Sequence, residues 1–171
     1  MIVVLMGVAG AGKTTVGKLL SERLGWPLLD ADDFHPPANI EKMRSGIPLT
    51  DDDRWPWLDR LNGLLKDKES NGENALLACS ALKQIYRDRL AAGCSDLCWV
   101  HLKGSFELIE SRLKARKGHY MNAGLLESQF AALEEPVDAI TADISAAPEA
   151  IADMVEAALH DAQMSAAASR R

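Results

Sequence analysis

The residues with the clearest chemical meaning form a glycine-rich run near the start of the chain. Residues 7–14 read GVAGAGKT, which is the spacing G-x-x-x-x-G-K-T. Glycines let the backbone curl around an anion, so that successive N–H groups and the next helix N-terminus face phosphate oxygens. Lys13 then reaches the β- and γ-phosphates, and the Thr14 hydroxyl completes the coordination of Mg²⁺. The predicted nucleotide-binding residues of this P-loop are Gly7, Val8, Ala9, Gly10, Ala11, Gly12, Lys13, Thr14 and Thr15.

An acidic group is the second feature with chemical content, and it follows the apolar run 27–30. Asp30 and Asp32 are two residues apart, so in an extended chain their side chains point to the same side. We assign Asp30 to the metal, through a bound water, and Asp32 to an acceptor hydroxyl, which it orients and deprotonates. The alternative is a solvated turn or a helix cap, and Asp33 fits that alternative best.

Two motifs that are absent from the sequence narrow the classes of P-loop protein to which it could belong. The apolar run 74–79 ends in Cys79 and Ser80, without the acidic residue that motor and ATPase domains place beside magnesium. No Asn-Lys-x-Asp element for reading guanine occurs either. These observations disfavour an ATP-hydrolysing motor or ATPase and a GTP-dependent switch, and ATP is the expected phosphoryl donor.

These residues need a scaffold that brings separate loops to one edge. Short apolar runs alternate with longer amphipathic segments, which is typical of a parallel sheet covered by helices. We predict strands at 2–6, 27–30, 74–79, 97–102 and 139–144. We predict helices at 13–24, 37–45, 53–69, 82–92, 105–117, 123–134 and 148–164. The segments 51–53 and 67–74 are interpreted as short polar connections. Ligands of an open parallel sheet bind at the carboxyl ends of its strands, where the P-loop and Asp30 would lie.

Composition limits the class of protein. A length of 171 residues with 47% apolar and 26% charged residues predicts one α/β domain over 1–171, with a loosely held tail at about 164–171. The net charge of −6 disfavours nucleic acid or anionic lipid as a partner. The first apolar run is too short to cross a bilayer, and we expect neither a membrane anchor nor export. Three cysteines without paired spacing suit reduced thiols in the cytoplasm.

Several longer blocks carry a more specific signal than the P-loop. They are DDFHPPANI at 32–40, DDDRWPWL at 51–58, CSALK at 79–83, GHYM at 118–121 and SQF at 128–130. From the P-loop to about Pro136 the chain resembles the gluconate kinase family. The resemblance implies a three-layer P-loop kinase fold with a five-stranded parallel sheet flanked by helices, similar to shikimate kinase and nucleoside monophosphate kinases. It also implies transfer of the ATP γ-phosphoryl group to the 6-hydroxyl of D-gluconate, and it suggests a homodimer.

The departures from the family pattern are mild, and two alternatives stay open. Ala9 and Ala11 stand where many relatives carry serine, but these positions contribute backbone N–H groups. Asn122 replaces a proline that commonly follows the GHYM block, which affects the stiffness of the chain there. The alternatives are a kinase for another small acceptor, such as shikimate or a nucleoside monophosphate, and a non-catalytic ATP-binding module.

The implied substrate, an open-chain polyol with one carboxylate, needs a cation with planar donors and several hydroxyl partners. Arg54 is our leading carboxylate ligand, with a surface ion pair to the neighbouring aspartates as the alternative. Lys83 and Arg87 lie four apart in a predicted helix, and that face suits an anion or solvent equally. The expected substrate contacts are Asp32, His35, Arg54, Lys83, Arg87 and His119.

The basic run before the GHYM block predicts a mobile lid at about 112–125. Arg112 and Arg116 share a helix face, and Gly118 gives the chain the freedom of a hinge. Closure would carry positive charge over the phosphates and exclude water from them. A solvated basic helix face is the alternative. We expect Arg112 and Arg116 to contact the nucleotide, and Lys13, Asp32 and Arg116 to be the catalytic residues.

Overall fold

A five-stranded parallel sheet forms the centre of this computed structural model, which describes residues 1–115 and 123–169. The strands are β1 (Ile2–Met6), β2 (Leu28–Asp30), β3 (Ala75–Ala78), β4 (Leu97–Lys103) and β5 (Ile140–Asp143). They lie in the order β2-β3-β1-β4-β5, and every neighbouring pair is parallel. Val3 of β1 pairs with Leu76 of β3 on one side and with Cys98 of β4 on the other. All their carboxyl ends therefore meet at one edge.

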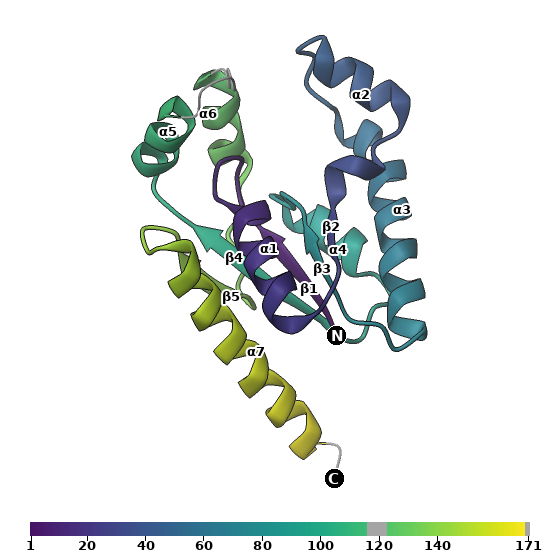
Figure 1. The fold of residues 1–171 in the computed structure, drawn as a ribbon. Helices are drawn as coiled ribbons and strands as arrows, with labels where there is room; N and C mark the ends of the chain where they lie inside the picture. Colours follow the sequence, from purple (N-terminus) through teal and green to yellow (C-terminus); the bar gives the residue numbers. More distant parts are fainter. Residues whose placement is uncertain (116–122, 170–171) are drawn as a thin grey trace.

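Helices cover both faces of the sheet (Figure 1). They are α1 (Lys13–Leu24), α2 (Pro37–Arg44), α3 (Asp51–Ser70), α4 (Gln84–Ala91), α5 (Phe106–Ala115), α6 (Ala123–Ala132) and α7 (Pro148–Ser169), with a 3₁₀ turn, η1 (Ala31–Phe34). At the P-loop end of the sheet, α2 and α3 stand on one side and α5 and α6 on the other (Figure 1). None of the described helices combines the length and apolar content that crossing a membrane requires.

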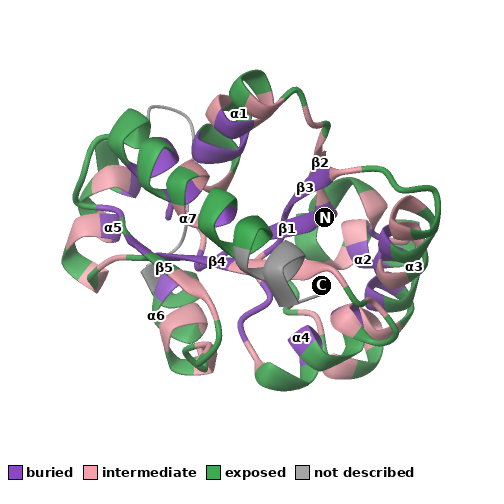
Figure 2. Ribbon diagram, turned by 90° about the horizontal axis from the view of Figure 1, so that it is seen from below, coloured by how far each residue is buried: buried purple, intermediate pink, exposed green. Residues whose placement is uncertain are grey.

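The core has two halves because β1 is apolar on both faces. Its side chains alternate in direction, so Val3 and Leu5 pack with α1, α5, α6 and α7, while Ile2, Val4 and Met6 pack with α3 and α4. Figure 2 shows the buried residues gathered on the strands and on the inward faces of the helices. This arrangement gives the three layers that the sequence predicts, and it fixes the strand ends that carry the site.

All five predicted strands are confirmed within one or two residues, and so are six of the seven predicted helices where the structure describes them, whereas α7 runs five residues past its predicted end at 164. The interpretation of 51–53 as a polar connection is wrong, because these residues form the first turn of α3. Thr50 and Asp53 make a capping box there, and acidic side chains suit a helix N-terminus. Residues 67–70 likewise end α3, and α7 continues to Ser169, so the expected loose tail is helical that far. Half of the predicted lid at 112–125, namely residues 116–122, lies outside the described residues.

Candidate active site

The P-loop joins β1 to α1 and adopts the shape that its glycines allow. Gly7 has φ +143°, and a Cβ there would lie 2.8 Å from the carbonyl oxygen of Leu102 in β4. Gly12 caps α1 in the left-handed conformation, at φ +97°. A side chain at Gly7 would collide with the neighbouring strand, and one at Gly12 would be strained by its backbone. The loop conformation therefore depends on glycine at these two positions.

Several N–H groups of the P-loop face no protein acceptor within the described residues. They belong to Gly10, Gly12, Lys13 and Thr14, and the last two are also in the first turn of α1, where helical N–H groups lack intrahelical partners. A helix N-terminus with free N–H groups is a site for an anion. The loop therefore offers the phosphate cradle that the sequence predicts.

Lys13 lies within the loop. Its Nζ donates to the carbonyl oxygens of Gly7 and Val8 at 2.9 and 3.1 Å. Burial lowers the pKa of Lys13, and the negative charges of Asp32 and Asp30 act in the opposite direction. These influences place the two carboxylates within electrostatic reach of the loop lysine, because β2 and β1 end at the same edge of the sheet.

Asp30 and Asp32 sit at the end of β2, where the chain turns into η1. An oxygen of Asp30 accepts from the Asp32 N–H at 3.1 Å and so caps the turn, which is one of the structural roles weighed for this acidic group. The Asp32 side chain is 84% exposed. Even so, partial desolvation by the surrounding protein raises its pKa, and the like charge of Asp30 raises the pKa further. A carboxylate with a raised pKa that faces solvent is suited to accept a proton.

His35 is buried beside Asp32 rather than exposed on a turn. Its ring stacks on the indole of Trp57, with centroids 4.3 Å apart. The side-chain amide of Asn39 lies 3.4 Å from Nδ1, which accepts from it when the proton is on Nε2. Nε2 is 3.9 Å from a carboxylate oxygen of Asp32. Burial lowers the pKa of His35, which favours the neutral ring.

The two predicted carboxylate ligands meet at a third residue, Asp51. Lys83 Nζ is 3.3 Å from both carboxylate oxygens of Asp51, and Arg54 Nη1 is 3.8 Å from one of them. The hydroxyl of Tyr86 donates to Asp51 at 2.5 Å, and this bond is the main reason why the pKa of Asp51 is lowered. Arg54 also donates to the carbonyl of Leu49 at 2.6 Å. Both cations thus converge, and the ion-pair alternative for Arg54 is present in the structure.

Arg87 takes a different place from the one expected. Its side chain is only 3% exposed, and Nη1 donates to the carbonyls of Ala81 and Leu82 at 2.9 and 3.1 Å. Ala81 has a positive φ of +43°, which is unusual for a residue with a side chain. Through these two bonds the buried guanidinium stabilises the loop after β3. It does not join Arg54 and Lys83, so we assign it a supporting role instead of a direct substrate contact.

The lid residues are described only in part. Arg112, in the last turn of α5, donates from Nη2 to the carbonyl of Ile144 at 2.6 Å. Arg116 and His119 lie outside the described residues. Gln129 was given no role from the sequence, although its side chain contacts the P-loop. The SQF block marks its position, but nothing in the sequence links it to a loop 120 positions earlier.

A magnesium ion fits the donors at this edge. Within the described residues no group of three or more His, Cys, Asp or Glu side chains could hold a metal by itself. Magnesium bound with a nucleotide needs only one or two protein ligands, because phosphates and water supply the others. The Thr14 hydroxyl and the Asp30 carboxylate are hard oxygen donors of the required kind.

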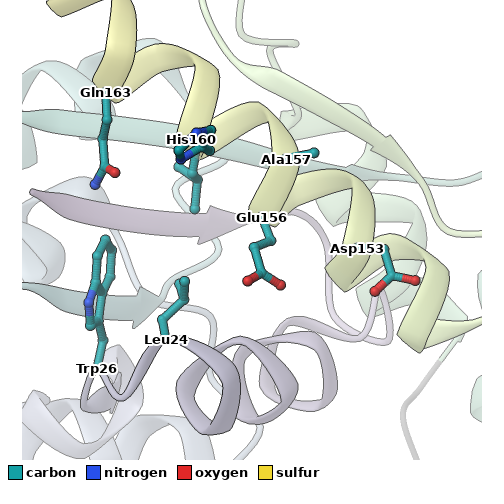
Figure 3. A pocket seen from close by; sticks show the side chains of 8 residues that line it. Leu24, Trp26, Asp153, Glu156, Ala157, His160 and Gln163 are labelled. Carbon is teal, nitrogen blue, oxygen red and sulfur yellow. The ribbon is translucent and has the colours of Figure 1, made fainter. Parts of the chain in front are cut away.

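An open hollow on another face contains none of the predicted site residues (Figure 3). It measures about 430 Å³ and lies between the end of α1 and the side of α7 that faces it, with Leu24 and Trp26 on one side and His160 and Gln163 on the other. The predicted phosphate and acceptor residues described above lie instead in the loops at the carboxyl ends of β1, β2 and β3 and at the start of α3.

Comparison with known proteins gives consistent matches along the chain. A family model described as "AAA domain" matches residues 2–160. The thermoresistant gluconokinase of Escherichia coli (strain K12) is 48% identical over 147 residues, which cover 84% of this chain and 84% of that protein. The probable gluconokinase of Xenopus tropicalis is 46% identical over 151 residues and 80% of each chain. The crystal structure of a gluconokinase from Sinorhizobium meliloti 1021 superposes with a TM-score of 0.89 at 38% identity, covering 99% of this chain and 97% of that one.

Proposed function

The chain belongs to the gluconokinase family, and from this premise we propose that it transfers the γ-phosphoryl group of ATP to the 6-hydroxyl of D-gluconate. The products are 6-phospho-D-gluconate and ADP. The observation that carries the proposal is the position of Asp32 beside the P-loop, within electrostatic reach of Lys13. An exposed carboxylate next to a phosphate cradle is what a hydroxyl acceptor needs, since phosphoryl transfer depends on positioning and charge stabilisation.

The nucleotide half of the site uses the P-loop. The free N–H groups of Gly10, Gly12, Lys13 and Thr14 bind the β- and γ-phosphates. Lys13 exchanges its bonds to the Gly7 and Val8 carbonyls for phosphate oxygens. Thr14, and Asp30 through water, hold Mg²⁺, which neutralises charge on the phosphates. Arg112 and Arg116 remain the proposed lid contacts to the nucleotide, and Thr15 completes the loop.

The acceptor half of the site uses the turn η1 after β2, the start of α3 and the loop after β3. Asp32 accepts the proton of the gluconate 6-hydroxyl, and the oxygen of that hydroxyl forms a bond to the γ-phosphorus. At the same time the bond between the γ-phosphorus and the β,γ-bridging oxygen breaks, and ADP leaves. His35, whose single ring proton is on Nε2, donates a hydrogen bond with that proton to the acceptor from a position beside Asp32. Arg54 and Lys83 bind the carboxylate. Together they carry two positive charges against the single charge of Asp51, so one more carboxylate balances the cluster.

We also propose the remaining properties that the family suggests. The chain forms one kinase domain over 1–171, His119 contacts the acceptor from the lid, and two copies form a homodimer. Cys79, Cys94 and Cys98 are unpaired, which agrees with the reducing conditions of a cytoplasm. Light scattering coupled to size-exclusion chromatography tests the dimer, since a monomer mass at micromolar concentration would contradict it.

An acceptor panel with coupled detection of ADP tests the activity. The panel contains D-gluconate, its neutral counterpart D-glucose, shikimate and nucleoside monophosphates, each at a range of concentrations. We expect turnover with gluconate alone, and phosphorus NMR should place the new phosphate on the 6-oxygen. Tight ATP binding without any phosphorylated polyol acid would refute the proposal in favour of a non-catalytic ATP-binding module. A preference for shikimate or a nucleotide would refute the acceptor.

A further inference from the structure

One N–H group of the P-loop binds a side chain from a distant part of the sequence. The Ala9 N–H donates to Oε1 of Gln129 at 2.6 Å, although 120 positions separate the two residues. Gln129 lies in α6 and is half-buried. Because only the oxygen of a side-chain amide accepts from an N–H, this bond fixes how the amide is turned. The two amide N–H donors of Gln129 therefore also lie beside the phosphate loop.

Helix α6 is anchored well enough to hold Gln129 in place. Leu126 is 1% exposed in the core, and the ring of Phe130 meets a phenylalanine of α5 with centroids 5.4 Å apart. Just after α6, the Glu134 N–H donates to the Leu82 carbonyl at 2.9 Å, and its carboxylate accepts from the Gln84 N–H at 2.5 Å. The segment that carries Gln129 is thus tied to the P-loop at one point and to the loop after β3 at another.

Because the Ala9 N–H is bonded to Gln129, it is not among the N–H groups that remain free for phosphate. Other N–H groups of the loop bond within the protein, as Gly7 does to the Ser80 carbonyl at 3.3 Å and Ala11 to the Val8 carbonyl at 3.2 Å. With Ala9 held by Gln129, the N–H groups of Gly10 and of 12–14 are left for the ligand. The side chain of Gln129 therefore helps to set the curvature of the cradle.

We propose that Gln129 is a positioning residue for phosphoryl transfer, which fixes the P-loop through Ala9 and adds uncharged donors beside the bound phosphates. The inference rests on the proposed function, because that function assigns the loop to MgATP. A neutral amide suits both tasks. A carboxylate at this position would accept from the Ala9 N–H equally well, but it would repel a polyphosphate. Comparing an amide with a carboxylate at position 129 therefore distinguishes an effect on nucleotide binding from an effect on the stability of the fold.

The experiment compares two variants at this position. Gln129→Met removes the acceptor without adding charge, and we expect the Kd for MgATP to rise about two- to tenfold, the value of one hydrogen bond. Gln129→Glu keeps the acceptor and adds a negative charge, so its Kd should rise about 10- to 100-fold while the unliganded protein melts at the wild-type temperature. Calorimetric titration with MgATP in the absence of gluconate measures the affinities, and differential scanning calorimetry measures the melting.

Ser128→Ala is the matched control, because the exposed Ser128 hydroxyl bonds only to the Leu125 carbonyl of its own helix in the described structure. It should bind MgATP as the wild type does. Wild-type affinity in Gln129→Glu would overturn the proposal, because a hydrogen-bond acceptor alone would then suffice. Loss of affinity in Ser128→Ala equal to that in Gln129→Met would overturn it too. A wild-type protein that binds MgATP but does not phosphorylate gluconate would refute the proposed function and leave this test intact.

Discussion

Replacing Asp32 by asparagine removes the proposed base and keeps the shape of the side chain. A positioned general base contributes about 10²- to 10⁴-fold to a rate, so we expect kcat to fall by that factor, or about 3 to 5 kcal/mol of transition-state stabilisation. The affinity for MgATP should change less than about twofold, since the P-loop binds the phosphates through other groups. Coupled detection of ADP gives kcat, and calorimetric titration gives the affinity.

The structure predicts that this loss of turnover comes without a loss of stability. The Asp32 side chain is 84% exposed, and the nearest ring nitrogen of His35, whose neutral form burial favours, is 3.9 Å away. Its pKa is raised in the folded protein above 3.8, the ordinary value, so the folded state holds this proton more tightly than the unfolded chain does. The ionised carboxylate consequently opposes folding at neutral pH. Asp32→Asn should therefore melt at the wild-type temperature or slightly above it at pH 7.

The raised pKa also predicts a pH dependence of the rate. As the pH falls through the raised pKa of Asp32, the carboxylate takes up a proton and no longer accepts one from the acceptor. The wild-type kcat should fall in that range, at a pH above the one expected for an unperturbed aspartate. The residual rate of Asp32→Asn should lack this acid limb, because asparagine does not titrate.

Asp33→Asn is the control, since Asp33 is exposed in the same turn and was assigned no chemical role. It should keep kcat within about twofold of the wild type, as surface changes away from the chemistry usually do little. The assignment of Asp32 would be refuted by near-normal turnover in Asp32→Asn. It would also be refuted by an unchanged acid limb, or by a melting temperature low enough to account for the lost activity.

Three further predictions concern the acceptor site and the helix that carries it. Arg54→Met should raise the KM for gluconate about 10- to 100-fold with the KM for ATP unchanged, because a charge-assisted bond to the carboxylate is lost; steady-state kinetics in both substrates would contradict this if the two KM values rose together. Arg87→Met should lower the free energy of unfolding by about 2 kcal/mol, since the carbonyls of Ala81 and Leu82 lose their donor; a fully stable variant with a raised KM for gluconate would instead indicate a direct contact. Thr50→Ala should lower the free energy of unfolding by about 1 kcal/mol through loss of the cap of α3. Urea unfolding measures this free energy for both variants, and an unchanged unfolding midpoint in Thr50→Ala would refute the role of the cap.

Much of the fold was predictable because its signals are local. The runs that became β1 and β3 are continuous and buried on both faces, as expected for central parallel strands. The runs that became β2, β4 and β5 are shorter or mixed and less buried, but their spacing between helical segments was enough to locate them. The start of α3 was missed although its signal was readable, since Thr50 and Asp53 have capping-box spacing. The dense charge at 51–53 was interpreted as a connection, whereas acidic residues in a first turn favour the helix.

The candidate site was predictable where one motif carries a function by itself. The P-loop and the acidic turn at the end of β2 each place their groups within a few residues, so spacing alone locates them. The position of Arg87 was not predictable in this way. The helical pattern predicts that Arg87 and Lys83 share a face, but α4 begins at Gln84 and Lys83 is its extended N-cap. Whether Arg87 meets solvent or the loop 81–82 depends on how α4 packs.

The sequence by itself therefore determined the order of elements, the phosphate cradle and the carboxylate that follows β2, because these depend on local backbone conformation and on periodicity. Only the tertiary structure decided which distant side chains meet: Lys83 and Arg54 at Asp51, and Gln129 at the N–H of Ala9. Hydrogen bonds and ion pairs act over a few ångströms of space, whatever the separation along the chain. Strand order and helix packing set those distances, and no single segment contains that information.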